Sequence, residues 1–119
     1  MVTALMIRPG EHPWPTLLAD DSDFLNCAVN RGWGTFYTAM ARRVEPGIAV
    51  LYANEAAIMG GIGNRKVNGR IYADTIYIVG HKDGALVSLT DDAVAKYTML
   101  LWEPEQYTED EIIDSYLLE

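Results

Sequence analysis

The sequence predicts an α+β domain with a mainly antiparallel sheet of four or five strands, one short N-terminal helix and two C-terminal helices. Three observations lead to this fold class. Runs rich in apolar and β-branched residues, separated by turn residues, occupy most of the first 90 positions. Asn68-Gly69 and Glu45-Pro46-Gly47 are typical of tight turns between neighbouring strands. Apolar residues at helical spacing occur in a short N-terminal segment and again after residue 90.

Length and composition indicate one domain. Half of the 119 residues are hydrophobic, which is enough to build a core. We assign residues 1–104 to a single α+β domain and residues 105–119 to an acidic C-terminal helical extension, packed on that domain or on a partner. The N-terminus lacks a basic region and meets Pro9 after a short apolar run, which favours neither a signal peptide nor a membrane span. Cys27 is the only cysteine, which excludes an internal disulfide and a multi-cysteine metal site.

The N-terminal part is expected to contain a strand, a loop and a short helix. Thr3–Arg8 is apolar on both faces and predicts an interior strand, which a Pro-Gly pair ends. Two prolines in residues 11–15 predict an extended surface loop that presents His12 and Trp14. Trp14 is then either a lid over the core or a contact residue. Acidic N-cap candidates start a short helix over residues 20–29.

The middle of the chain predicts two hairpins. Thr35–Val44 and Ile48–Ala53 form the first, and the second of these strands is apolar on both faces, as in the centre of a sheet. Asn68-Gly69 forms the turn of the other hairpin, since both positions of a type I′ turn need positive φ. We expect Arg70–Val79 to continue from this turn as one long strand.

The C-terminal part predicts two helices after a short strand at residues 85–89. The first helix starts at Ser88-Leu89-Thr90-Asp91 and ends before Pro104. The second starts at a capping box, Thr108-Glu109-Asp110-Glu111. It carries an apolar stripe on an acidic background, which consists of Ile112, Ile113, Tyr116 and Leu117. This stripe either packs on its own core, makes a homodimer or docks onto a partner protein.

A Gly-rich basic stretch at residues 60–70 is the main candidate for ligand binding. Three glycines in four positions let a backbone approach a ligand closely, and the cations that follow favour an anion. The alternative is a loop whose glycines only serve its turns. An aromatic side chain, Trp33, Tyr52 or Tyr72, would stack on a base, and Arg42 or Arg43 would add charge. The candidate ligand-binding residues are Gly60, Gly61, Gly63, Asn64, Arg65, Lys66, Arg70, Trp33 and Tyr52.

The net charge of −8 is unevenly distributed. Acidic and basic residues balance over residues 1–90, while the last 29 residues hold nine acids against Lys96. Residues 31–70 are basic, with six Arg and Lys against two Glu, a net charge of +4. The acidic tail would repel duplex nucleic acid, so we expect no direct binding to it. A local pocket for a small anion is compatible with this distribution.

Several short motifs occur together in one order: Pro9-Gly10, Tyr52-Ala53-Asn54-Glu55, Gly60-Gly61-Ile62-Gly63-Asn64-Arg65, Ile76-Tyr77-Ile78-Val79-Gly80 and Ser88-Leu89-Thr90-Asp91. With them the chain resembles the domain of unknown function 3846 family, small phage- and plasmid-borne proteins, over roughly residues 3–104. The resemblance implies no established activity. It implies residence in phages or mobile elements, and hence action in the cytoplasm of a bacterial host cell. Asn54, Glu55, Asn64 and Arg65 form its most specific feature, which is either functional or structural, with Asn64 capping a turn and Arg65 pairing with Glu55.

The sequence offers few candidate catalytic residues. His12 and His81 are the only histidines and form no metal-binding pair, and the glycines match neither a P-loop nor a dinucleotide fingerprint. We therefore expect a non-catalytic protein without a cofactor or metal. Seven tyrosines and three tryptophans give more aromatic surface than one core needs, which favours a homo-oligomer.

Three functions remain open. The first is a phage or mobile-element accessory protein that counters host defence by binding and sequestering a small anionic, nucleotide-type host ligand. The second is an acidic inhibitor that binds a host defence or DNA-acting protein, by mimicry of DNA or by docking of the last helix. The third is a small enzyme of unknown type, in which substitution of His81 or Cys27 would remove turnover.

Overall fold

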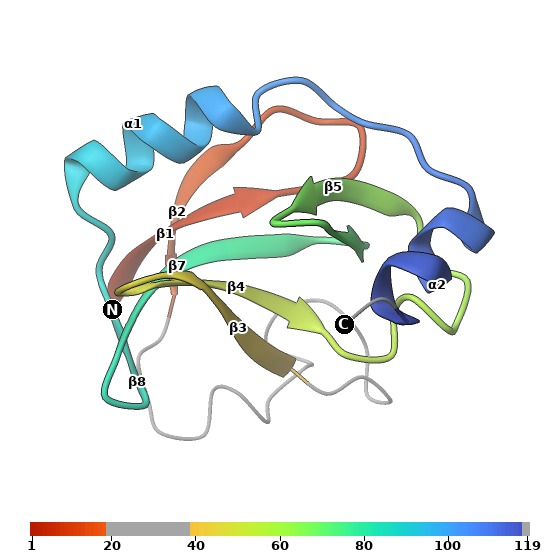
Figure 1. Ribbon diagram of the computed structural model, residues 1–119. Helices are drawn as coiled ribbons and strands as arrows, with labels where there is room; N and C mark the ends of the chain where they lie inside the picture. Colours follow the sequence, from red (N-terminus) through yellow and green to blue (C-terminus); the bar gives the residue numbers. More distant parts are fainter. Residues whose placement is uncertain (19–38, 118–119) are drawn as a thin grey trace.

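The computed structural model describes residues 1–18 and 39–117 (Figure 1). The expected helix over residues 20–29, the start of the predicted strand at Thr35 and the candidate Trp33 lie outside these ranges. The described part is an α+β fold with a mainly antiparallel sheet, as predicted, but the main sheet has six strands where four or five were expected. Its two helices, α1 (Asp91–Leu100) and α2 (Glu109–Leu117), both follow the strands.

Six strands make up the main sheet, and each neighbouring pair is antiparallel. The order is β2-β1-β7-β4-β3, and β8 pairs with β7 beyond this path. The bounds are β1 (Val2–Ile7), β2 (Trp14–Leu18), β3 (Ala39–Glu45), β4 (Ile48–Ala53), β7 (Ile76–Lys82) and β8 (Ala85–Val87). A separate hairpin joins β5 (Gly63–Val67) to β6 (Arg70–Ala73). Its turn has positive φ at both Asn68 and Gly69, which confirms the predicted type of turn.

Two predictions about strands are wrong. Residues 11–15 do not form only a loop, because Trp14–Leu18 pairs with β1 as an edge strand. Pro15 fits there, since an edge strand has one side on which a missing N–H costs nothing. The predicted strand Arg70–Val79 is divided between two sheets at Asp74, which has φ of 60°. The Asp74 carboxylate accepts a hydrogen bond from the Ile62 backbone N–H at 2.9 Å. This bond stabilises the chain at the point where the strand is interrupted.

The core lies on both faces of the main sheet. On one face, Leu5, Ile78 and Val50 pack with Tyr97 of α1. On the other, Leu51 and Val79 belong to a cluster that also includes Ile112 of α2. In Figure 1, α1 runs alongside the N-terminal strands and α2 lies beside the β5–β6 hairpin. The β5–β6 hairpin therefore contributes to both clusters, while α1 contributes to the first and α2 to the second.

The predicted capping box of α2 is present. The Thr108 backbone N–H donates to Glu111 Oε1 at 2.9 Å, and the Glu111 backbone N–H donates to Thr108 Oγ1 at 3.2 Å. These hydrogen bonds to Thr108 lower the pKa of the Glu111 carboxyl. A lowered folded pKa means that the ionised form stabilises the fold, and that this stabilisation is lost as the pH falls through the folded pKa.

Thr108→Ala is expected to lower the free energy of unfolding by about 1 kcal/mol at pH 7, because it removes one half of the capping box. The part of this difference that comes from the bond between the Thr108 side chain and the ionised Glu111 carboxyl should shrink as the pH falls through the folded pKa of Glu111, which lies below its ordinary value. Urea unfolding at pH 7 and pH 3.5 measures it. Equal stability of the two proteins at pH 7 would show that the box does not hold α2.

Candidate functional site

The Gly-rich stretch is packed against the protein itself. A Cβ atom at Gly61 would lie 2.6 Å from the Ala56 carbonyl oxygen, to which the Gly61 N–H donates at 2.9 Å. A Cβ atom at Gly63 would lie 3.0 Å from Tyr107 Cβ. Gly60 has φ of 78° and open space where a Cβ atom would be. Two of the three glycines thus allow close contact between segments of this chain, as in the alternative in which they serve local structure.

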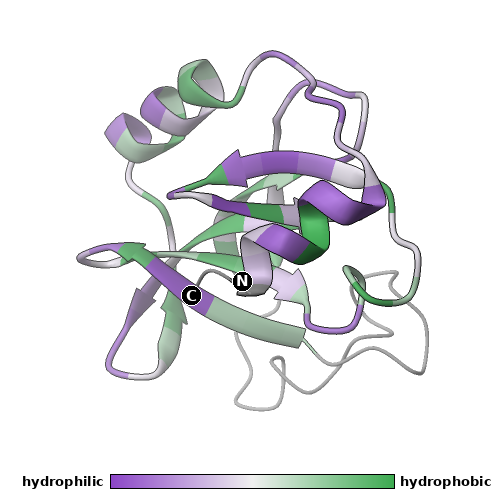
Figure 2. Cartoon of the chain, turned by 45° about the vertical axis from the view of Figure 1, so that its right-hand side comes forward, coloured by the Kyte–Doolittle hydropathy of each residue, from purple (hydrophilic) through white to green (hydrophobic). Residues whose placement is uncertain are grey.

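Asn64 and Arg65 of β5 are fully buried, although β5 is hydrophilic over most of its length (Figure 2). Asn64 Nδ2 donates to the carbonyls of Ile7 at 2.9 Å and Asp74 at 2.8 Å. Its side-chain oxygen accepts from Arg65 Nη1 at 2.9 Å. A buried amide with these partners fixes the position of β5 against the end of β1.

The Arg65 guanidinium joins three segments of the chain. Nε donates to the carbonyl of Leu101 at 2.9 Å, and Nη2 donates to the carbonyl of Glu11 at 2.6 Å. Burial lowers the pKa of Arg65, yet an arginine stays protonated at neutral pH. The predicted partner Glu55 is replaced by these main-chain carbonyls. Arg65 therefore connects β5, the segment after β1 and the end of α1. The sequence had instead suggested that Arg65 contacts a ligand.

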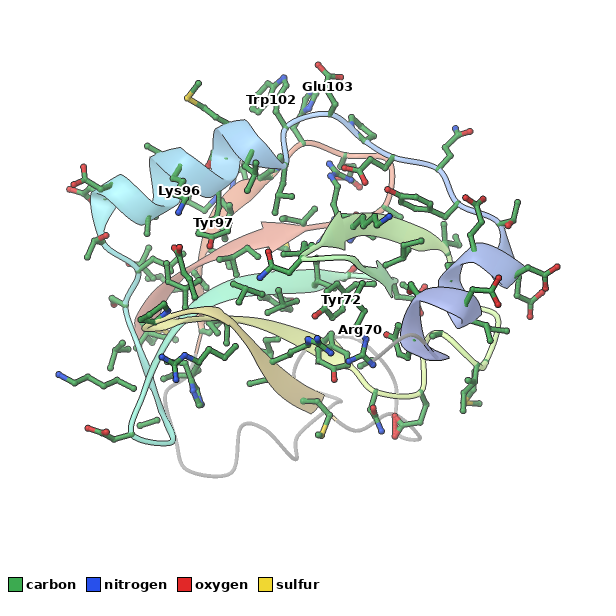
Figure 3. All side chains as sticks on the ribbon, viewed as in Figure 1. Arg70, Tyr72, Lys96, Tyr97, Trp102 and Glu103 are labelled. Carbon is green, nitrogen blue, oxygen red and sulfur yellow. The ribbon has the colours of Figure 1, made fainter. Side chains whose placement is uncertain are left out.

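Three tyrosine rings lie close to the Arg70 guanidinium on β6, and Figure 3 labels Arg70 and one of them, Tyr72. The guanidinium carbon lies 3.6 Å from the ring centroid of Tyr116 and 5.1 Å from that of Tyr52. Tyr52 and Tyr72 meet edge to face at 5.0 Å. Burial raises the pKa of the Tyr72 and Tyr116 hydroxyls. The structure thus brings the ligand candidates Arg70 and Tyr52 together. They form a cation–π cluster with Tyr116, which belongs to the predicted apolar stripe of α2.

The apolar stripe of α2 packs largely against the domain. Ile112 is 1% exposed and belongs to the core, and Ile113 is half-buried. Ser115 Oγ accepts from the Ile71 backbone N–H at 3.0 Å, which fixes α2 on β6. The side chain of Leu117 lies outside the described residues. This packing matches the alternative in which the stripe covers its own core, and it leaves the acidic outer face of α2 to the inhibitor hypothesis.

A pocket of about 840 Å³, which we call the aromatic pocket, lies between the segment that follows β1 and the end of α1. Its aromatic side chains are His12, Trp14 and Trp102. Trp14 is 68% exposed and Trp102 is 44% exposed, so two tryptophans present their rings to solvent at one cavity. Trp14 is therefore not a lid over the core. The interpretation of Trp14 as a contact residue agrees with its position.

His12 holds one wall of the aromatic pocket to the other. Its ring stacks on Trp102 with centroids 4.0 Å apart and planes 9° apart. His12 Nδ1 lies 2.7 Å from the Trp102 carbonyl oxygen, and because a carbonyl only accepts, Nδ1 carries the proton. Nε2 is then the ring nitrogen that remains for a hydrogen bond with a ligand.

The buried Arg65 supports the same two walls. Its acceptor Glu11 precedes His12, and its acceptor Leu101 precedes Trp102. The Asn64-Arg65 pair was predicted to bind a ligand in a loop. It instead fixes the two backbone segments that carry His12 and Trp102 of the aromatic pocket. Lys66, the next residue, is exposed, and its backbone N–H donates to Glu105 Oε1 at 3.1 Å.

Sequence reasoning did not single out Trp102 or Arg8 as site residues. A signal for Trp102 exists, because it stands at the predicted end of the helix, shortly before Pro104. Leu101 caps the C-terminus of α1 and is buried, while Trp102 lies beyond the helix and is 44% exposed. Arg8 is exposed at the end of β1 and lines the aromatic pocket. No comparable pattern marks Arg8 in the sequence.

Comparison of the chain with protein-family models, with curated proteins and with solved structures found no match. Among the described residues, no helix is long and apolar enough to cross a membrane. The assignment of a function therefore depends on the geometry of the aromatic pocket.

Proposed function

We propose that this protein is a non-catalytic binding protein whose aromatic pocket takes a small anionic, nucleotide-type ligand. The observation that carries the proposal is the exposure of Trp14 and Trp102 at one cavity, with His12 stacked on Trp102. Tryptophan is largely buried in most folds, so two exposed rings at a pocket indicate a contact surface. A flat aromatic ligand gains about 1–3 kcal/mol from stacking on each such ring.

The size and lining of the pocket suit a nucleotide. Its volume of about 840 Å³ lies in the range typical of small-molecule sites. Most of the lining is aromatic, proline or methionine, and the polar groups are few. Glu11 and Thr98 are among them, and together with Nε2 of His12 they offer hydrogen-bond partners to the edge of a base. A nucleobase is flat, polar at its edge and apolar on its faces, which matches this arrangement.

Arg8 would bind the phosphate of such a ligand. It lies at the same pocket as the aromatic rings, and its guanidinium suits two oxygens of a phosphate at once. Glu11 is the acidic side chain of the same lining, and its charge opposes that of Arg8.

The resemblance to phage- and plasmid-borne proteins suggests a biological role for ligand binding. A protein without catalytic groups that holds a host nucleotide removes it from its receptors, and we propose counter-defence in the bacterial cytoplasm by this sequestration. The amount of ligand removed depends on the affinity and on the number of protein copies, not on turnover.

Titration of nucleosides and nucleoside 5′-monophosphates into wild type and Arg8→Gln tests the anionic part of the proposal. Wild type should bind the monophosphate about threefold to tenfold more tightly than the nucleoside, as expected for a partly solvated ion pair. Arg8→Gln should bind both equally. Lys66→Gln is the control, because Lys66 is an exposed cation outside the pocket. Equal affinity of wild type for both ligands would contradict the role of Arg8.

A further inference from the structure

A second pocket, which we call the basic pocket, lies where the β3–β4 turn meets the β7–β8 turn. Its volume is about 350 Å³, and it is lined by Arg43, Gly47, His81, Lys82 and Asp83. It shares no lining residue with the aromatic pocket. The cations come from two different hairpins, so the tertiary fold and not the local sequence brings them together.

The frame of this pocket is fixed by backbone contacts. The His81 N–H donates to the Gly47 carbonyl at 2.9 Å, which ties the β7 end to the β3–β4 turn. Gly47 has φ of 82° and Asp83 has φ of 52°, so each of the two turns contains a residue in the left-handed conformation. A shift of register between Arg43 and Glu45 marks a bulge in β3 beside the pocket. Bulges of this kind re-aim side chains near the end of a strand.

The charges of the basic pocket are not balanced by the residues that the structure describes. Among the described residues, neither Arg43 nor Lys82 has an ion-pair or hydrogen-bond partner on its side chain. Lys96, in contrast, pairs with Glu45 at 2.9 Å. Nε2 of His81 is buried and has no hydrogen-bond partner in the described part of the chain. Asp83 is the acidic residue of the lining, which leaves a net positive pocket on a protein of net charge −8.

We infer that the basic pocket binds a phosphate group, either as inorganic phosphate or as the end of a phosphate monoester. A tetrahedral oxyanion offers acceptors to the guanidinium of Arg43 and the ammonium of Lys82 at the same time, and His81 lines the same pocket. The volume exceeds that of one phosphate and leaves room for the group to which it is esterified. This inference does not depend on the aromatic pocket, and it holds if that pocket takes no ligand.

The test is a titration followed by NMR of the His81 ring and of the Arg43 and Lys82 amides. Inorganic phosphate and methyl phosphate are added to the full chain at constant ionic strength, with sodium chloride as the reference salt. Saturable shifts of these signals with both phosphates, and none with chloride, are expected. Tighter binding of methyl phosphate identifies a phosphorylated molecule as the ligand, and equal binding identifies free phosphate.

Two variants connect the signal to the pocket. Arg43→Gln and Lys82→Gln should each weaken phosphate binding about threefold to tenfold, and both side chains are exposed, so the fold should survive. Lys66→Gln, an exposed cation elsewhere, should bind as wild type does. Shifts that do not saturate, or an affinity that neither variant changes, would overturn the inference.

Discussion

Arg65→Met is expected to lower the free energy of unfolding by roughly 3–5 kcal/mol, the largest effect of any single substitution predicted for this protein. Methionine fills a similar volume but donates no hydrogen bond. The carbonyl of Leu101 and the side-chain oxygen of Asn64 would then stay buried without these donors, and the partly buried bond to the Glu11 carbonyl would be lost as well. Each unsatisfied buried acceptor costs about 1–3 kcal/mol.

Urea unfolding of wild type, Arg65→Met and Lys66→Met measures this effect. Lys66 follows Arg65 on the same strand but is exposed, so Lys66→Met should stay within about 0.5 kcal/mol of wild type. For Arg65→Met we expect a fall in melting temperature of more than about 10 °C. If Arg65→Met is as stable as Lys66→Met, the guanidinium does not connect the three segments.

Trp14→Ala is expected to weaken binding of a nucleoside monophosphate about 5-fold to 150-fold, which corresponds to the loss of one stacking contact of about 1–3 kcal/mol. The stability of the fold should change by less than about 0.5 kcal/mol, because most of the Trp14 side chain is exposed. Melting temperatures of the two proteins check this second expectation.

Leu17→Ala is the matched control for Trp14→Ala. Both residues lie on β2, and Leu17 is 61% exposed. Successive residues of a strand point to opposite faces, so Leu17 and Trp14 lie on different faces of β2. Leu17 does not line the aromatic pocket. A loss of affinity in Leu17→Ala equal to that in Trp14→Ala would indicate a general effect of β2 on binding.

Local signals in the sequence were enough to predict much of the fold. The Asn68-Gly69 and Pro46-Gly47 turns and the capping box of α2 each depend on residues a few positions apart, and the structure contains them. The break at Asp74 was not predicted, because an aspartate inside an apolar alternating run does not show whether it adopts positive φ. Its carboxylate is held by the Ile62 N–H, 12 positions away.

The candidate site was harder to predict, for a related reason. Arg65 looked like a ligand contact because arginine is almost never fully buried unless it is paired. Apart from its neighbour Asn64, its partners are the main-chain carbonyls of Glu11 and Leu101, and every residue type has such a carbonyl. The sequence therefore carries no pattern that marks this pairing. It follows only from the tertiary fold, which also brings Trp14 and Trp102 to one pocket from opposite ends of the chain.

Isothermal titration calorimetry of purine and pyrimidine nucleoside monophosphates into wild type, Leu17→Ala and Trp14→Ala tests ligand binding in the aromatic pocket most directly. We expect saturable binding of at least one of these nucleotides to wild type and to Leu17→Ala with the same affinity. Trp14→Ala should bind it at least about 5-fold more weakly. If none of the nucleotides binds to wild type, or if Trp14→Ala binds as tightly as wild type does, the aromatic pocket is not a nucleotide site.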